Sequence, residues 1–96
     1  MPYYSKKDYK LLGFRKSDRQ NKKYYALLEN RLNKNLVKVH FGDNRYQHYK
    51  DVTGLNDYIH LNHNDPIRRD RYRLRHNKDI KEGYYSSGYF SLFYLW

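Results

Sequence analysis

The scarcity of aliphatic residues is the feature that most constrains how this chain can fold. Its 96 residues include 13 Tyr, 4 Phe and 1 Trp, but only 17 residues of the types Leu, Val and Ile. A chain of this length forms one small domain, and its core has to use tyrosine rings whose hydroxyls stay in water or find a hydrogen-bond partner. Disordered proteins are poor in aromatics, whereas aromatic residues make up 19% of this chain. We therefore expect a single folded domain over residues 1–96 with a small core.

The first half of the chain predicts a three-stranded antiparallel meander. Short runs of aromatic and aliphatic residues alternate with turns rich in Ser, Asp and Asn, which is the pattern of successive hairpins. The expected strands cover residues 9–14, 24–28 and 36–41; the second run would also suit a helix, and the third ends at Gly42. Residues 1–8 are polar and are expected to form a flexible arm or a short edge segment.

The clearest predicted helix covers residues 65–77. Asp65 is a favourable N-cap, a proline follows at the first helical position, and arginines extend toward the C-terminal end, where they interact favourably with the helix dipole. At about 100° per residue, Ile67 and Leu74 share one face and Tyr72 points to the far side. The apolar stripe is therefore narrow, so one side of the helix has to face solvent or an anion.

Two further segments complete the expected fold. Residues 44–64 combine tyrosines with Gly and Asn residues that interrupt any regular pattern, which indicates an ordered loop with one helical turn. Residues 84–96 are the most apolar stretch and suit either a short helix capped by Ser86 or Ser87, or a buried strand. The predicted fold class is α+β: a small single domain with a three-stranded antiparallel meander, an Arg-rich helix and an apolar C-terminal segment.

The charge balance points to an anionic partner. The chain has 20 Lys and Arg against 10 Asp and Glu, which gives a formal net charge of +10 at pH 7. Most of the excess lies in residues 1–40 and 65–81, and it favours nucleic acid as the partner. The absence of Cys excludes a disulfide scaffold, a cysteine-ligated zinc site and a thiol nucleophile. No apolar run approaches a membrane span, and the first residues lack the apolar stretch of a signal peptide.

The Arg-rich helix is the first candidate binding element. Forked, permanently charged guanidinium groups on a rigid helix suit phosphate recognition, and a tyrosine among them can stack on a base. Two lysine pairs in the first quarter of the chain extend the basic surface. The predicted nucleic-acid-binding residues are Arg68, Arg71, Arg73, Tyr72, Lys6, Lys7, Lys22 and Lys23. A solvated helix face, or a surface that meets an acidic protein, is the alternative for the same residues.

The histidines suggest a second hypothesis, a metal-dependent nuclease. A hairpin followed by a helix with His, Asn and His resembles the ββα-metal nuclease arrangement, in which a strand His activates water and a helix His helps to hold the cation. Here His40 would be the base, and His76 with Asp65 or His63 would hold the metal. The spacing differs from that motif. The principal expectation is therefore a protein that is not an enzyme, with no catalytic residue, no metal, no cofactor and no small-molecule substrate.

A combination of short motifs carries a resemblance to a known family. The motifs are Val39–Asp43, Arg45–Tyr46, Tyr49–Asp51, His63–Asp65, Arg68–Arg69, Tyr72, Arg75–His76, Ser87–Ser91 and Leu95–Trp96. In this order they resemble an uncharacterised family of small basic proteins encoded by large DNA viruses of protists, with shorter relatives in tailed phages. Some phage relatives have a Cys shortly after the Arg–His pair, where this chain has Asn77 and Lys78, which argues against zinc.

The resemblance implies a viral protein, located in the virion or inside the host cell, in the cytoplasm or a viral factory, and not secreted. It also implies a structural framework that consists of Phe41, Gly42, Arg69, Arg75 and Trp96. For Arg69 and Arg75 this means that stacking on an aromatic ring, or binding to backbone carbonyls, stands beside phosphate binding. We expect a non-enzymatic virion or assembly protein whose basic, aromatic-rich surface binds nucleic acid or an acidic capsid partner. The alternatives are the nuclease and a capsid cement protein without nucleic-acid contact.

Overall fold

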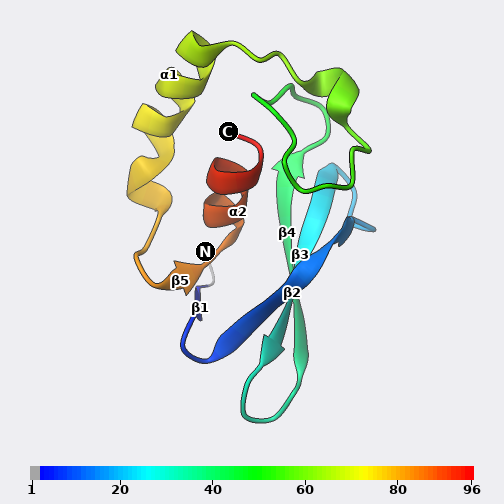
Figure 1. Cartoon of the computed structure of the whole chain (residues 1–96), viewed down its shortest axis with the longest axis vertical. Helices are drawn as coiled ribbons and strands as arrows, with labels where there is room; N and C mark the ends of the chain where they lie inside the picture. The colour runs from blue at the N-terminus through cyan, green and yellow to red at the C-terminus, as the bar shows by residue number, and fades with distance from the viewer. Residues whose placement is uncertain (1–2) are drawn as a thin grey trace.

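The predicted meander is present in the computed structural model, which describes residues 3–96 (Figure 1). Its strands are β2 (Tyr9–Lys16), β3 (Lys22–Asn30) and β4 (Leu36–Asp43). They form an antiparallel sheet in the order β2-β3-β4, which confirms the α+β class and shows that the second run is a strand and not a helix. Each strand extends beyond its predicted run, because the flanking Lys, Arg and Asp residues continue the pairing.

The core lies between the sheet and the C-terminal segment. Tyr24 of β3 lies opposite Phe41 of β4, and both rings are fully buried together with Phe90. The Tyr24 hydroxyl donates a hydrogen bond to the Asp51 carboxylate and accepts one from the Asp57 backbone N–H. A tyrosine thus serves as core material with its hydroxyl paired, as expected for a chain with few aliphatic residues.

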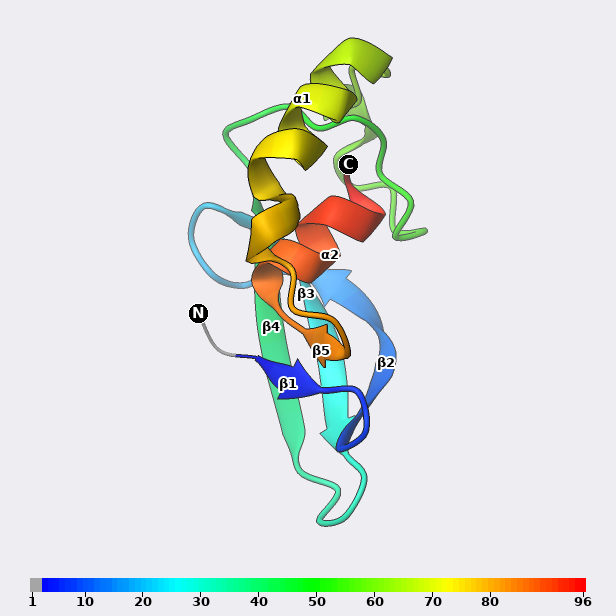
Figure 2. The same cartoon turned by 90° about the vertical axis from the view of Figure 1, so that its left-hand side faces the viewer.

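The C-terminal segment is a helix, α2 (Ser87–Tyr94), and not a strand. The Ser86 side chain caps it by accepting a hydrogen bond from the Tyr89 N–H at 3.2 Å. The longer helix α1 (Pro66–His76) follows the loop, which holds the short 3-10 helix η1 (Ile59–Leu61), and a second one, η2 (Asn77–Asp79), follows α1. α2 lies between α1 and the sheet (Figures 1 and 2). No helix formed by the described residues is both long and apolar enough for a membrane crossing.

A small second sheet joins the two ends of the chain. β1 (Tyr4–Ser5) pairs antiparallel with β5 (Tyr84–Tyr85), with Tyr4 opposite Tyr85 (Figure 2). Within residues 3–8 this pairing corresponds to the expected short edge segment, whereas residues 1 and 2 of the expected arm lie outside the described residues. The sequence pattern does not predict β5, because two tyrosines between turn residues are too short a run to indicate a strand.

The orientation predicted for α1 is wrong. Ile67 and Leu74 do not face the core; they are 64% and 77% exposed. Tyr72, expected on the far side, faces inward and stacks on Trp96 with ring centroids 4.1 Å apart and planes 5° from parallel. Two large flat rings bury more area than an isolated Ile and Leu pair, so the aromatic contact decides which side of α1 faces the protein. The half-buried positions of α1 are Arg69, Tyr72 and His76.

Candidate nucleic-acid interface

A cleft of about 720 Å³ lies between α1 on one side and the ends of β3 and β4 on the other. We call it the basic cleft, because five of its lining side chains are basic and one is acidic. Its charged lining residues are Lys22, Lys23, Arg45, Arg68, Arg75 and Asp43. Tyr46, Gln47, Tyr72 and Trp96 also line it, with parts of α2 at its floor.

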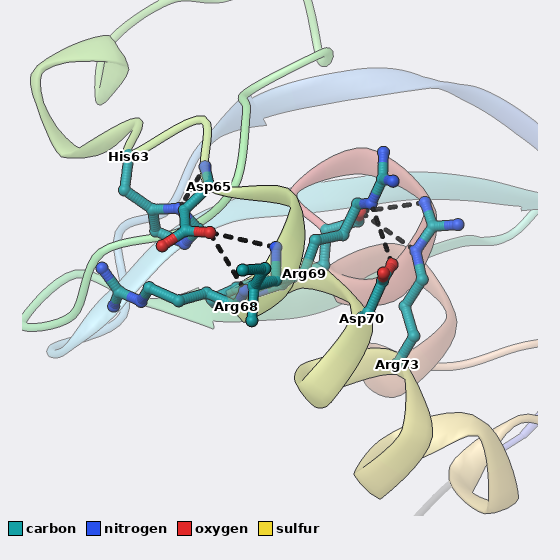
Figure 3. Close-up of polar contacts among 8 residues, drawn as sticks. His63, Asp65, Arg68, Arg69, Asp70 and Arg73 are labelled. Atoms are coloured by element: carbon teal, nitrogen blue, oxygen red, sulfur yellow. Dashed lines mark hydrogen bonds and ion pairs between the residues drawn. The ribbon is translucent and has the colours of Figure 1, made fainter.

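The start of α1, from which Arg68 projects, is capped by the Asp65 side chain (Figure 3). The Asp65 carboxylate accepts hydrogen bonds from the backbone N–H groups of Ile67 at 3.0 Å and Arg68 at 3.4 Å, as the sequence predicts for an N-cap. Arg68 Nη1 donates to Gln47 Oε1 at 2.9 Å across the mouth of the cleft. Arg75 lies two turns further along the same wall. Both guanidinium groups are exposed, and neither pairs with a carboxylate among the described residues.

The loop after β4 supplies the opposite lip of the cleft. Arg45 forms an ion pair with Asp43, with Nη2 2.6 Å from Oδ2, and the Arg45 backbone N–H donates to the same carboxylate at 2.9 Å. The hydrogen bonds from the Arg45 side chain and backbone lower the pKa of the Asp43 carboxyl to about 2. The only acidic side chain that lines the cleft is therefore already neutralised by its neighbour. Tyr46 follows with an exposed ring.

The aliphatic part of the Lys23 side chain lines the cleft, whereas its ammonium group donates hydrogen bonds inside the protein. The residue is 2% exposed, and Nζ donates to the Tyr46 carbonyl oxygen at 2.9 Å and to His48 Nδ1 at 2.8 Å. Burial lowers the pKa of the Lys23 ammonium to about 8, although the charges of Asp43 and Asp51 act in the opposite direction. Lys23 therefore positions the loop that carries Tyr46, and Lys22 is the lysine of this pair whose ammonium is not bound in this network.

Trp96 and Arg73 fasten α1 to the rest of the protein. The Trp96 ring contacts Tyr72, as described, and also the His63 ring, with centroids 5.1 Å apart. The Trp96 carbonyl oxygen accepts hydrogen bonds from Arg73 Nε at 3.2 Å and Nη2 at 2.9 Å (Figure 3). Arg73, predicted to bind phosphate, is thus turned away from the cleft and bound to a backbone carbonyl.

The other predicted framework residues have distinct roles. The Arg69 guanidinium lies over the Tyr49 ring, 4.7 Å from its centroid, and its Nε is 3.5 Å from Asp70 Oδ1. Phe41 is part of the core. Gly42 has a φ of +75°, and a Cβ there would lie 2.8 Å from Leu95 Cδ1, so only glycine fits. Arg75 takes no such internal role: it is exposed and lines the basic cleft.

The remaining predicted binding residues lie outside the basic cleft. Arg71 lines a neighbouring hollow of about 430 Å³, together with Arg68, Arg75 and Trp96. Lys6 lies over the Tyr89 ring, 4.4 Å from its centroid, and Lys7 is exposed at the turn between β1 and β2. A further hollow of about 470 Å³ shares Lys22 with the basic cleft and is lined by Arg19, Lys38 and His40 among others. The basic surface thus continues from the cleft along β4.

The three histidines of the nuclease hypothesis each contact a different partner. His40 Nδ1 is 2.7 Å from the Ser17 hydroxyl, and burial lowers the pKa of its imidazole. His63 Nδ1 accepts from the Asp65 N–H at 3.0 Å, and His76 Nδ1 lies 2.9 Å from an Asp79 carboxylate oxygen. Over residues 3–96, no three His, Cys, Asp or Glu side chains converge in an arrangement that could hold a metal ion.

Sequence reasoning did not name Arg45 and Gln47 as binding residues, and for Arg75 it left a framework role and phosphate binding open. A sequence signal existed for Arg75, because it follows Arg68 by seven residues and therefore lies on the same face of the helix. None existed for Gln47, whose role depends on how the loop after β4 meets α1. Comparison of the chain with models of known protein families, with curated proteins and with solved structures gives no match.

Proposed function

We propose that the protein is a non-enzymatic nucleic-acid-binding protein that holds a phosphate backbone in the basic cleft. The observation that carries the proposal is the convergence of Arg68, Arg75 and Lys22 on one cleft whose only carboxylate is already paired with Arg45. Guanidinium groups in a fixed position bind phosphate oxygens through forked hydrogen bonds. The exposed Tyr46 ring at the lip offers a face on which a base can stack.

The resemblance of the sequence motifs to small basic proteins of large DNA viruses adds a role in virus assembly or in the interior of the particle. A small protein with net charge +10 that holds nucleic acid through its backbone suits such a role, because backbone contacts do not depend on sequence. An acidic capsid protein is the competing partner for the same basic surface.

The test is a titration of labelled single- and double-stranded DNA at low and at physiological salt, with and without Mg²⁺. We expect affinity to fall by orders of magnitude between about 50 and 200 mM salt, as contacts with several phosphates require. The double variant Arg68→Ala/Arg75→Ala is expected to lower the slope of log affinity against log salt by about 2, one unit for each lost phosphate contact.

The matched control is Arg15→Ala/Lys16→Ala, which removes the same charge from two exposed residues of β2 that do not line the cleft. A specific cleft predicts that this control keeps the wild-type salt slope to within about half a unit. Equal losses in both double variants would mean that only net charge matters. Weak binding without salt dependence would overturn the proposal and favour a protein partner, whereas Mg²⁺-dependent cutting of the DNA would favour the nuclease.

A further inference from the structure

The hairpin between β3 and β4 projects from the end of the molecule opposite α1 (Figure 1). The protein is elongated, with extents of 41 × 27 × 21 Å, and the hairpin tip lies at one end of its long axis. All residues from 31 to 36 are exposed. The tip is therefore a separate surface that shares no residue with the basic cleft.

The tip presents an apolar side chain between two basic ones. Leu32 is 93% exposed, and Arg31 and Lys34 flank it. Neither basic side chain forms an ion pair within the part of the chain that the structure describes. Lys34 Nζ donates to the Arg31 carbonyl oxygen at 3.1 Å and Arg31 Nη2 to the Lys6 carbonyl oxygen at 3.5 Å, and both groups keep further donors for an anion. A single exposed leucine is common on protein surfaces, but here it is the outermost apolar group of a projecting basic hairpin.

The backbone of the tip is firmly held. The Asn30 side chain oxygen accepts hydrogen bonds from the N–H groups of Leu32 at 2.9 Å and Asn33 at 3.2 Å, and the Lys34 N–H donates to the Asn30 carbonyl at 2.9 Å. Lys34 completes the turn in the left-handed region with a φ of +64°. A turn whose N–H groups are bound in this way keeps the backbone of Leu32 in place, so little backbone ordering is needed before the residue contacts a partner.

Further positive charge surrounds the base of the hairpin. The Arg31 N–H donates to the Asp8 carbonyl at 2.8 Å, which brings the turn between β1 and β2 against the hairpin. This places the exposed Lys7 and Lys10 on the same end of the molecule as Arg31 and Lys34, so that four basic side chains stand there against the two carboxylates of Asp8 and Glu29. A cationic partner is therefore disfavoured here, and a polyanion is favoured.

We infer that the hairpin tip is a second nucleic-acid site that inserts Leu32 as a wedge into the minor groove of duplex DNA. An apolar side chain pushed between two base pairs unstacks them and bends the duplex toward the major groove. That deformation opens the minor groove, about 6 Å wide in undistorted B-DNA, to the basic hairpin tip. Arg31 and Lys34 then meet the phosphates on either side of Leu32. The inference rests on the proposal that the protein binds nucleic acid, but it uses residues at the opposite end from the cleft.

The experiment measures the bend of a short A·T-rich DNA duplex that carries a fluorescence donor and acceptor at its two ends. Wild-type protein is expected to bring the ends closer, as a bend of roughly 20–90° requires. Leu32→Ala is expected to abolish the bend and to weaken binding about tenfold, because the apolar contact is lost. Ile67→Ala removes an exposed aliphatic side chain from α1 instead and is expected to change neither quantity.

The outcomes separate this inference from the proposed function. The cleft variant Arg68→Ala/Arg75→Ala should still bend the duplex at saturating concentration, although more protein is needed. The wedge is wrong if wild-type protein binds DNA without bending it, or if Leu32→Ala bends the DNA as much as wild type does. Either result would favour a protein partner for the tip and would leave the cleft proposal standing. If wild-type protein binds no DNA at any salt concentration, both fail together.

Discussion

The sheet with α2 and the helix α1 are held in place by different forces. On the sheet side, the rings of Tyr24, Phe41 and Phe90 are fully buried against one another. α1 has no buried residue; it is attached through the stack of Tyr72 on Trp96 and through polar contacts made by its arginines. The basic cleft therefore has two unlike walls. The wall formed by the sheet and α2 belongs to the core, and the α1 wall depends on a few aromatic and charged contacts. Substitutions that affect one wall should therefore spare the other.

The largest expected effect tests the core wall. Phe90→Ala removes a fully buried ring that packs against Phe41, Phe14 and Tyr85. We expect the free energy of unfolding to fall by about 3–5 kcal/mol, which is most of the stability of a small domain. Urea denaturation followed by circular dichroism measures the change.

The matched control lies on the same helix. Phe93→Ala removes a ring of the same size from a half-exposed position of α2, and we expect a loss of less than about 1 kcal/mol. Comparable losses for the two variants would mean that burial in the core is not what holds α2 against the sheet.

The same division explains how much could be predicted from the sequence. The meander and the N-cap at Asp65 follow from local rules of alternation, turn chemistry and capping, and both are correct. The same rules left the C-terminal segment open between a helix and a strand, and the structure shows the helix. The inward face of α1 could not be predicted, because it is decided by Trp96, which is far away in the sequence. Of the residues proposed from the sequence to bind nucleic acid, four line the cleft: Arg68, Tyr72, Lys22 and Lys23. Arg73 and the Lys23 ammonium instead bind internal acceptors, which only the tertiary structure reveals.

The loop between the two regions should make the protein sensitive to acid. His48 is fully buried, and burial together with the Lys23 charge lowers the pKa of its imidazole to about 4. Its Nδ1 accepts from Lys23, and its Nε2 faces the Asn62 side chain oxygen, which also accepts from the Asp51 N–H. Because lysine can only donate and that oxygen can only accept, the neutral imidazole with its proton on Nε2 is the form that fits.

The sign of the pH dependence follows from that lowered pKa. In the unfolded chain a histidine titrates near about 6.5, so between pH 6.5 and 4 the unfolded state binds more protons, and stability falls as the pH falls. The stabilising contribution is complete above about pH 6.5, and about 3 kcal/mol is lost by pH 4, from 1.36 kcal/mol per pKa unit. Urea titrations at several pH values measure this loss.

The comparison of two histidine variants assigns the loss to His48. Glutamine can accept from Lys23 and donate to Asn62 without titrating, so His48→Gln is expected to flatten the stability curve between pH 6.5 and 4. His60→Gln changes an exposed histidine of the same loop and serves as the control. If the slope is the same in wild type and in His48→Gln, the acid sensitivity has another origin.

The smallest expected effect tests the α1 wall. Trp96→Ala removes the stack on Tyr72 and the contact with His63 but keeps the carbonyl oxygen that binds Arg73. We expect a loss of about 2 kcal/mol that is mainly local, because the aromatic stack is the principal apolar contact of α1. Amide hydrogen exchange, read by residue, should accelerate by about tenfold or more in α1 while exchange in β3 changes little.

The control for the stack keeps the ring and removes only the hydroxyl. Tyr72→Phe retains the parallel contact with Trp96, so exchange in α1 should stay within about twofold of wild type. If Trp96→Ala accelerates exchange equally in α1 and in β3, Trp96 belongs to the same cooperative unit as Phe90, and the division into two walls is wrong. If the acceleration is confined to α1, the helix that carries Arg68 and Arg75 is the less stable wall. A bound phosphate backbone would then stabilise that wall in particular, since a ligand that contacts both walls favours the state in which they are held together.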